Sequence, residues 1–137
     1  RNLPIDEAAP EIVLRQLASA DHMSALEPGE TGVVYFFAPW CFYCRHSIAN
    51  LDGLVASGRV SWASAVALSY SSEAEVAAFV AETGIAMPVL MGTEATARNW
   101  SVSAFPTYYV ISADGKIASR SVGYSTWLGM WFRTLFA

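Results

Sequence analysis

The sequence predicts an α/β fold in which a central sheet is covered by helices on both faces. Two apolar stretches, residues 33–37 and 60–69, have the length of strands, and a segment with helical apolar spacing follows each one. The first stretch is continuously apolar, which is typical of a strand buried on both faces. Because strands and helices alternate along the chain, these strands should be parallel and joined by right-handed crossovers.

The composition indicates one globular domain, residues 1–137. The 137 residues are 54% hydrophobic and 15% charged, which excludes a disordered chain. A chain of this length buries about two thirds of its unfolded surface. The net charge of −4 argues against a nucleic acid partner. No apolar run reaches the roughly 18 residues that span a bilayer, so we expect any signal or membrane anchor to lie outside this chain.

Residues 1–30 are predicted to form an irregular lead-in segment. Within it, Ile12–Leu14 fits either a short strand or the start of a helix. The segment 21–26 is predicted to be a short helix with Asp21 as its N-cap. The sequence 27–32 is rich in Pro and Gly and predicts a turn before the first buried strand.

The middle of the chain carries recognisable helix ends. A first helix should run to about Ala56 and stop at Gly58. After the strand within 60–69, Ser72 and Glu75 have the spacing of a capping box, and Gly84 ends the helix that they begin. A short strand within residues 84–91 and a helix over 93–100 should follow.

The C-terminal third predicts a hairpin and a last helix. The strands 107–111 and 117–122 flank a turn at 112–115. Ser125 or Thr126 should cap the final helix. Its apolar residues form two adjacent stripes, Trp127, Trp131 and Leu135 beside Leu128 and Phe132. Together the stripes predict a core-facing helix. A membrane-surface helix would need more basic residues than Arg133.

The two cysteines lie where the first buried strand passes into the first helix. Cys41 is expected at the helix N-terminus, with Cys44 one turn inside. The partial positive charge and unpaired N–H groups of a helix N-terminus favour a thiolate. Cys44 shares an apolar stripe with Ile48. We therefore predict that Cys41 is the exposed nucleophile and that Cys44 is the shielded, resolving thiol.

The spacing of the cysteines favours a reversible redox pair. A disulfide between them closes a very small loop and would constrain the unfolded chain little. A zinc site would need two further ligands, and the chain offers only His22 and His46, with no second Cys-x-x-Cys. We therefore expect no metal and no cofactor other than the redox-active Cys41–Cys44 disulfide.

Two motifs together resemble the thioredoxin superfamily. Trp40-Cys41-x-x-Cys44 follows an apolar strand, and Phe105–Thr107 occurs about sixty residues later. The resemblance implies a thioredoxin-like mixed sheet, a cis bond before Pro106, and a Pro106 that faces the disulfide. It also implies that Trp40 packs beside the disulfide and limits solvent access. The residues expected to contact substrate are Trp40, Phe42, Tyr43, Phe105 and Thr107.

The extra strand and helix before the proline strand resemble the TlpA, ResA and DsbE branch, whose members are extracytoplasmic and often membrane-tethered. This resemblance implies a thiol–disulfide oxidoreductase that acts on protein cysteines in the periplasm. It favours a reductant, serving cytochrome c maturation or another thiol protein. An upstream redox partner, in some cases membrane-bound, would supply its electrons.

The chain departs from that pattern in its charges. Carboxylates are common six residues before the first cysteine or three after the second, and these positions hold Tyr35 and Ser47. Arg45 and any charge on His46 should stabilise the Cys41 thiolate, which favours an oxidant or isomerase. A non-catalytic, redox-sensing binding module also remains open. Peroxide reduction is disfavoured because no Thr lies beside Cys41.

Overall fold

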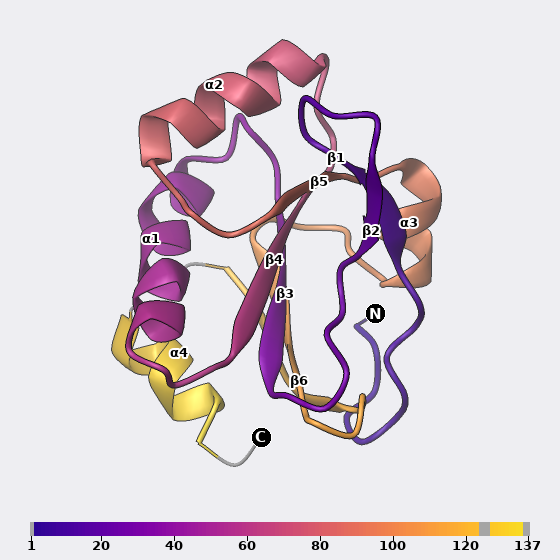
Figure 1. Ribbon diagram of the computed structural model, residues 1–137, viewed down its shortest axis with the longest axis vertical. Helices are drawn as coiled ribbons and strands as arrows, with labels where there is room; N and C mark the ends of the chain where they lie inside the picture. The colour runs from indigo at the N-terminus through magenta and orange to yellow at the C-terminus, as the bar shows by residue number, and fades with distance from the viewer. Residues whose placement is uncertain (1, 124–126, 136–137) are drawn as a thin grey trace.

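A seven-stranded mixed sheet forms the centre of the computed structural model, which describes residues 2–123 and 127–135 (Figure 1). Its strand order is β2-β1-β5-β4-β3-β6-β7. The elements in chain order are β1 (Val13–Gln16), β2 (His22–Ser24), β3 (Gly32–Phe37), α1 (Phe42–Ala56), β4 (Trp62–Ala67), α2 (Glu73–Thr83), β5 (Val89–Met91), α3 (Glu94–Asn99), β6 (Thr107–Ile111), β7 (Ile117–Val122) and α4 (Trp127–Arg133).

The centre of the sheet is parallel and its flanks are antiparallel. Strand β4 pairs in parallel with both β3 and β5, and these three strands are joined through α1 and α2. Strands β6 and β7 extend the sheet antiparallel on one side, and β1 and β2 do so on the other. The predicted mixed sheet is therefore confirmed, including the short strand β5 and helix α3 before β6.

Strand β3 is buried over its whole length because helices cover both faces of the sheet. Tyr35 and Phe37 point into the core that α1 and α2 cover, together with Ile48 of α1. Phe36 points into the opposite core, where its ring lies 5.5 Å from that of Trp100 at the end of α3. The alternation of a strand explains how one continuous apolar run serves two cores.

The lead-in segment 1–30 is more ordered than the sequence predicted. It contributes β1 and β2, and β1 pairs with β5. The short helix expected over 21–26, with Asp21 as its N-cap, is wrong. The Gln16 N–H donates to the Asp21 carbonyl at 2.8 Å, and Leu14 pairs with Met23. The turn between them includes Ala18 at a φ of 58°, so this stretch closes a hairpin.

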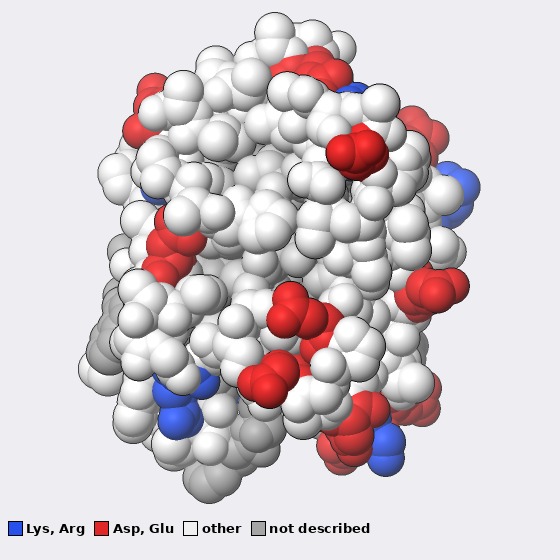
Figure 2. Space-filling model, viewed as in Figure 1, with Lys and Arg blue, Asp and Glu red and all other residues white. Residues whose placement is uncertain are grey.

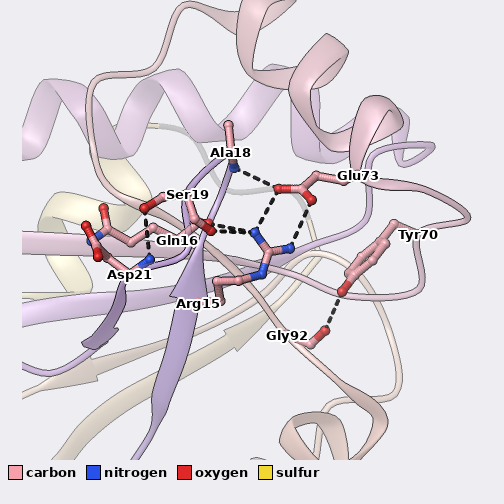
Figure 3. A network of polar contacts seen from close by, with 8 residues as sticks. All are labelled: Arg15, Gln16, Ala18, Ser19, Asp21, Tyr70, Glu73 and Gly92. Carbon is pink, nitrogen blue, oxygen red and sulfur yellow. Dashed lines mark hydrogen bonds and ion pairs between the residues drawn. The ribbon is translucent and has the colours of Figure 1, made fainter.

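A partly exposed ion pair attaches this hairpin to the start of α2 (Figure 3). The Arg15 guanidinium donates to both carboxylate oxygens of Glu73, at 2.9 and 3.1 Å. The Ala18 N–H donates to the same carboxylate at 2.7 Å. These bonds lower the pKa of Glu73, the bond from Arg15 having the largest effect. The pair is bidentate, the geometry in which arginine binds carboxylates best.

Helix α2 begins and ends where the sequence predicted, with one difference in its capping box. Gly84 caps α2 in the left-handed conformation, at a φ of 67°. The Ser72 hydroxyl accepts from the Glu75 N–H at 3.2 Å, as predicted, but the Glu75 carboxylate accepts from the Ser71 N–H and not from that of Ser72. None of the helices in the described ranges combines the length and apolarity that crossing a bilayer requires.

Helix α4 faces the core with fewer residues than expected. Met130 is buried and Trp131 packs partly against the core below α1. Leu128 and Phe132, which the sequence assigned to the core-facing surface, are 66% and 64% exposed. A seven-residue helix that rests on the core through residues 130, 131 and 134 necessarily turns 128 and 132 outward. The predicted caps, Ser125 and Thr126, lie outside the described residues.

We predict that Glu73→Gln removes part of the acid dependence of stability. A carboxylate with a lowered pKa stabilises the fold above its ordinary pKa of about 4.3, and this contribution is lost as the pH falls below that value. The variant should therefore be less stable than the wild type at neutral pH and should lose less stability on acidification. Urea unfolding at several pH values measures this.

The matched control is Glu94→Gln, which changes the same residue type in the first turn of α3. Glu94→Gln should change stability less at neutral pH and should keep the acid dependence of the wild type. Equal behaviour of the two variants would show that the Arg15–Glu73 pair contributes nothing beyond an ordinary helix N-terminal carboxylate.

Candidate active site at the start of helix α1

Cys41 is the N-cap residue of α1. Its backbone is extended, at φ −81° and ψ 115°, and its sulfur accepts a hydrogen bond from the Cys44 N–H at 3.2 Å. The sulfur thus occupies the position that a Ser or Asp oxygen takes in an ordinary N-cap. No acidic residue lies in the first turn of α1. The exposed N–H group and the helix dipole therefore favour negative charge on this sulfur.

Both cysteines are buried free thiols, and this corrects one expectation. Cys41 is 5% exposed and Cys44 is fully buried. The predicted order is right, since Cys44 is the more shielded of the two, but Cys41 is not an exposed side chain. The neighbouring Trp40 and Phe42 are exposed, at 58% and 64%, although Cys41 between them is buried.

The environment of Cys44 disfavours its thiolate. Burial raises the pKa of the Cys44 thiol strongly, and the hydrogen bond and charge of Cys41 raise it further. The Ala38 backbone and the Tyr35 hydroxyl act in the opposite direction, because each can hydrogen-bond the sulfur. Cys44 is therefore a protonated thiol at neutral pH in the reduced pair, as a resolving cysteine must be until its partner has reacted.

Two buried hydroxyls lie next to Cys44, and sequence reasoning did not identify them as a pair. The Tyr35 hydroxyl on β3 is hydrogen-bonded to the Ser47 hydroxyl on α1. Tyr35 and Ser47 were singled out only as the positions that lack a carboxylate. Their contact follows from two regular patterns, since Ser47 is one turn after Cys44 and Tyr35 faces the same core from the sheet.

Arg45, which the sequence predicted to stabilise the Cys41 thiolate, forms an ion pair with the neighbouring helix. Its guanidinium pairs with the Glu82 carboxylate on α2 and lies 5.6 Å from the centre of the Phe79 ring. Both side chains of the pair are partly exposed to solvent. His46 is exposed, with its ring centre 4.4 Å from that of Phe42. Its side chain is therefore in contact with solvent and with one ring of the neighbouring surface.

The segment that holds the cysteines meets the segment that holds Pro106. The Phe105–Pro106 peptide bond is cis, as the resemblance implied, and Pro106 is buried. The Phe105 ring meets the Trp40 ring edge to face, with centres 5.8 Å apart. Each ring is adjacent in sequence to the residue expected in the site, Pro106 or Cys41. The structure therefore brings together the two motifs that lie about sixty residues apart.

Three exposed aromatic side chains surround this point, and we call Trp40, Phe42 and Tyr43 the aromatic rim. Their exposed fractions are 58%, 64% and 57%. The Trp40 indole N–H donates to the Ser69 carbonyl at 2.8 Å, so this ring is exposed but fixed. Thr107, also expected to contact substrate, is buried, and its hydroxyl donates to the Ala104 carbonyl at 2.7 Å. Its side chain does not reach the surface.

Other candidate sites lie elsewhere or lack ligands. A mainly apolar cavity of about 620 Å³ is lined by residues that include Val55, Trp62 and Met87, and it contains neither cysteine. Within the described ranges, no three His, Cys, Asp or Glu side chains cluster in a way that could hold a metal ion. Acidic side chains are spread more widely than basic ones over the face drawn in Figure 2. The cysteine pair is therefore the candidate reactive site.

Comparison with known proteins agrees with this geometry. Residues 5–120 match the AhpC/TSA family. The thiol:disulfide interchange protein CycY of Rhizobium leguminosarum bv. viciae is 31% identical over 102 residues, which cover 72% of this chain and 53% of CycY. The chain thus spans about half the length of that relative.

Solved structures share the fold. A thiol:disulfide interchange protein of the thioredoxin family from Chlorobium tepidum superposes with a TM-score of 0.81 at 22% identity, covering 94% of each chain. A secreted Mycobacterium tuberculosis disulfide oxidoreductase, described as homologous to E. coli DsbE, gives a TM-score of 0.78 at 17% identity, covering 90% of this chain and 93% of its own. The predicted thioredoxin-like fold is confirmed. The chain belongs to the AhpC/TSA family.

Proposed function

We propose that this chain exchanges its Cys41–Cys44 disulfide with the cysteines of other proteins outside the cytoplasm. The observation that carries the proposal is the unequal environment of the two sulfurs. Cys41 caps α1 beside the aromatic rim, whereas Cys44 is sealed in the core one turn further on. Cys41 is thus placed to react with a partner, and Cys44 is placed to react only with Cys41.

The exchange takes place in two steps. The Cys41 thiolate attacks one sulfur of a partner disulfide, a Cys41–partner bond forms, and the partner's other sulfur leaves with the electron pair of the broken bond. Cys44 then attacks the Cys41 sulfur, the Cys41–Cys44 bond forms, and the second partner thiol is released. Two electrons pass from the dithiol to the partner, and the two sulfurs need no bound cofactor.

We favour a reductant, the direction that the resemblance to the TlpA, ResA and DsbE branch implies. An oxidant would be favoured if Arg45 and His46 stabilised the Cys41 thiolate, since a stabilised reduced form raises the reduction potential. The Arg45 guanidinium pairs with Glu82, and His46 is exposed to solvent. Both features weaken the stabilisation that these two residues could give. Thiol proteins of the extracytoplasmic space, such as those of cytochrome c maturation, are the proposed partners.

The proposed extracytoplasmic location is inferred from the relatives. One matching structure is that of a secreted disulfide oxidoreductase, and the TlpA, ResA and DsbE branch that the sequence resembles is extracytoplasmic. A reductant in an oxidising compartment needs a supply of electrons. We therefore propose an upstream redox partner that re-reduces the Cys41–Cys44 disulfide.

Cys44→Ala should accumulate a mixed disulfide with a protein that carries an accessible disulfide. The variant keeps the attacking sulfur and lacks the thiol that releases the partner. Non-reducing electrophoresis measures the adduct, and dithiothreitol should reduce its disulfide and separate the two proteins. Cys41→Ala is the matched control and should form no adduct. A Cys44→Ala protein that never forms one would indicate a docking module and not an exchange enzyme.

The reduction potential of the Cys41–Cys44 pair should lie below about −200 mV, in the range of reducing dithiol proteins. Equilibration with glutathione buffers, followed by counting of free thiols, measures it. A value near −120 mV, which is typical of a strong oxidant, would contradict the proposed direction of electron flow.

Phe42→Ala should slow exchange with a protein disulfide by about fivefold, equivalent to about 1 kcal/mol of lost partner contact. Its rate with a small aromatic disulfide should stay close to that of the wild type, because a small reagent does not cover the aromatic rim. The matched control is Phe132→Ala on α4, which removes an equally exposed ring, 64% in both cases. Equal effects of the two variants would indicate that the aromatic rim does not contribute to partner binding.

A further inference from the structure

Packing alone does not require the hydroxyls of the buried Tyr35–Ser47 pair. The Tyr35 ring stacks near that of Tyr108, with centres 6.2 Å apart, and a phenylalanine would make the same contact. The hydroxyls add a polar group to a core that is otherwise apolar around Cys44 and Ile48. Burying a hydroxyl is costly unless it is hydrogen-bonded, so the pair is satisfied only because each partner supplies the other.

The geometry places this pair against the resolving sulfur. Ser47 follows Cys44 by one helical turn, a rise of about 4.5 Å, and lies on the same buried face of α1. Tyr35 reaches that face from β3 and bonds to Ser47. The Tyr35 hydroxyl also lowers the pKa of the Cys44 thiol through a hydrogen bond to its sulfur. One phenolic hydroxyl thus adjoins both the serine and the cysteine.

We propose that the Tyr35 hydroxyl, supported by Ser47, donates a hydrogen bond to the Cys44 sulfur while Cys44 attacks the mixed disulfide, and so stabilises the thiolate that this step needs. This proposal rests on the proposed function and names the group that assists its second step.

The hydroxyl hydrogens of the pair can be arranged in two ways. Either hydroxyl of the Tyr35–Ser47 pair can be the donor. With Cys44 protonated, Tyr35 donates to Ser47. Once Cys44 carries charge, Ser47 donates to Tyr35 and Tyr35 donates to the sulfur. A hydrogen bond to a charged group is worth more than one between neutral groups, and a second donor strengthens the first.

Tyr35 itself does not titrate in this step. Burial raises the pKa of the Tyr35 hydroxyl well above its ordinary value, and the neighbouring sulfurs raise it further. The phenol therefore keeps its proton. Cys44 loses its proton to solvent, and its thiolate attacks the Cys41 sulfur. The Cys41–Cys44 bond forms, the bond from Cys41 to the partner breaks, and the partner sulfur leaves with the electron pair of that bond. The departing thiolate takes up a proton from solvent where its own pKa requires one, so atoms, electrons and protons balance.

Reaction with DTNB, an aromatic disulfide, separates the two steps. Cys41 of the reduced pair attacks the reagent and releases one coloured thiolate, and Cys44 releases the second when it resolves the mixed disulfide. In Tyr35→Phe the first phase should stay within about twofold of the wild type. The second phase should slow by about tenfold or more, as expected for loss of one hydrogen bond to a charged sulfur. Its pH midpoint should move upward.

Tyr108→Phe is the matched control. Tyr108 stacks on Tyr35 from β6, and its hydroxyl accepts a hydrogen bond from Arg133 at 3.1 Å. Removing this hydroxyl should leave both phases within about twofold of the wild type. Ser47→Ala is a second variant that keeps the Tyr35 hydroxyl, and it should slow the second phase by a smaller factor than Tyr35→Phe.

The outcomes distinguish this inference from the proposed function. A second phase that is unchanged in Tyr35→Phe, or a Tyr35→Phe variant that slows both phases equally, would overturn the role of the hydroxyl. A wild-type protein that shows no second phase would instead overturn exchange through Cys44, and with it the proposed function. An equal effect of Tyr108→Phe would show that the slowing reflects packing of the two rings.

Discussion

The burial of Cys44 is the constraint on which the site depends. A sulfur enclosed by apolar groups holds its proton, so it cannot compete with Cys41 for a partner. Cys41 differs because it caps α1, where a backbone N–H reaches its sulfur at 3.2 Å. Two identical residues three positions apart thus acquire different chemistry from one structural event, the passage of a core strand into a helix. The order of the two exchange steps follows from this difference.

Helix α2 connects the site with the rest of the fold. At its first residue Glu73 holds the lead-in hairpin through Arg15, and near its end Glu82 holds Arg45 of α1. Phe79, between them, stacks on Phe37 at 4.5 Å and lies below the Arg45 guanidinium. Helix α1 is thereby held to α2 by an ion pair and by the contact of the Arg45 guanidinium with the Phe79 ring.

What the sequence predicted well depends on near neighbours in the chain. The β3–α1 junction, the Ser72 cap and the hairpin after Pro106 are all set by residues within a few positions of one another. The errors concern partners that are distant in sequence. Residues 22–24 form a strand because they pair with β1, which itself lies beside β5, and α4 turns Leu128 outward because Met130 is the residue that it buries. The Arg45–Glu82 pair spans 37 residues, and no local pattern indicates it.

A hydroxyl pair beside a resolving thiol works differently from the carboxylate that the resemblance led us to look for. A buried carboxylate can accept the thiol proton, but it carries a charge whose burial is costly. Tyr35 and Ser47 are neutral and satisfy one another, so the reduced protein incurs no such cost. They can only donate to charge that already exists. The Cys44 proton must therefore pass to solvent before the attack, because the Tyr35 phenol keeps its own proton and cannot act as a base at neutral pH. Release of a partner then depends on how readily its sulfur leaves, and a sulfur of lower pKa leaves faster.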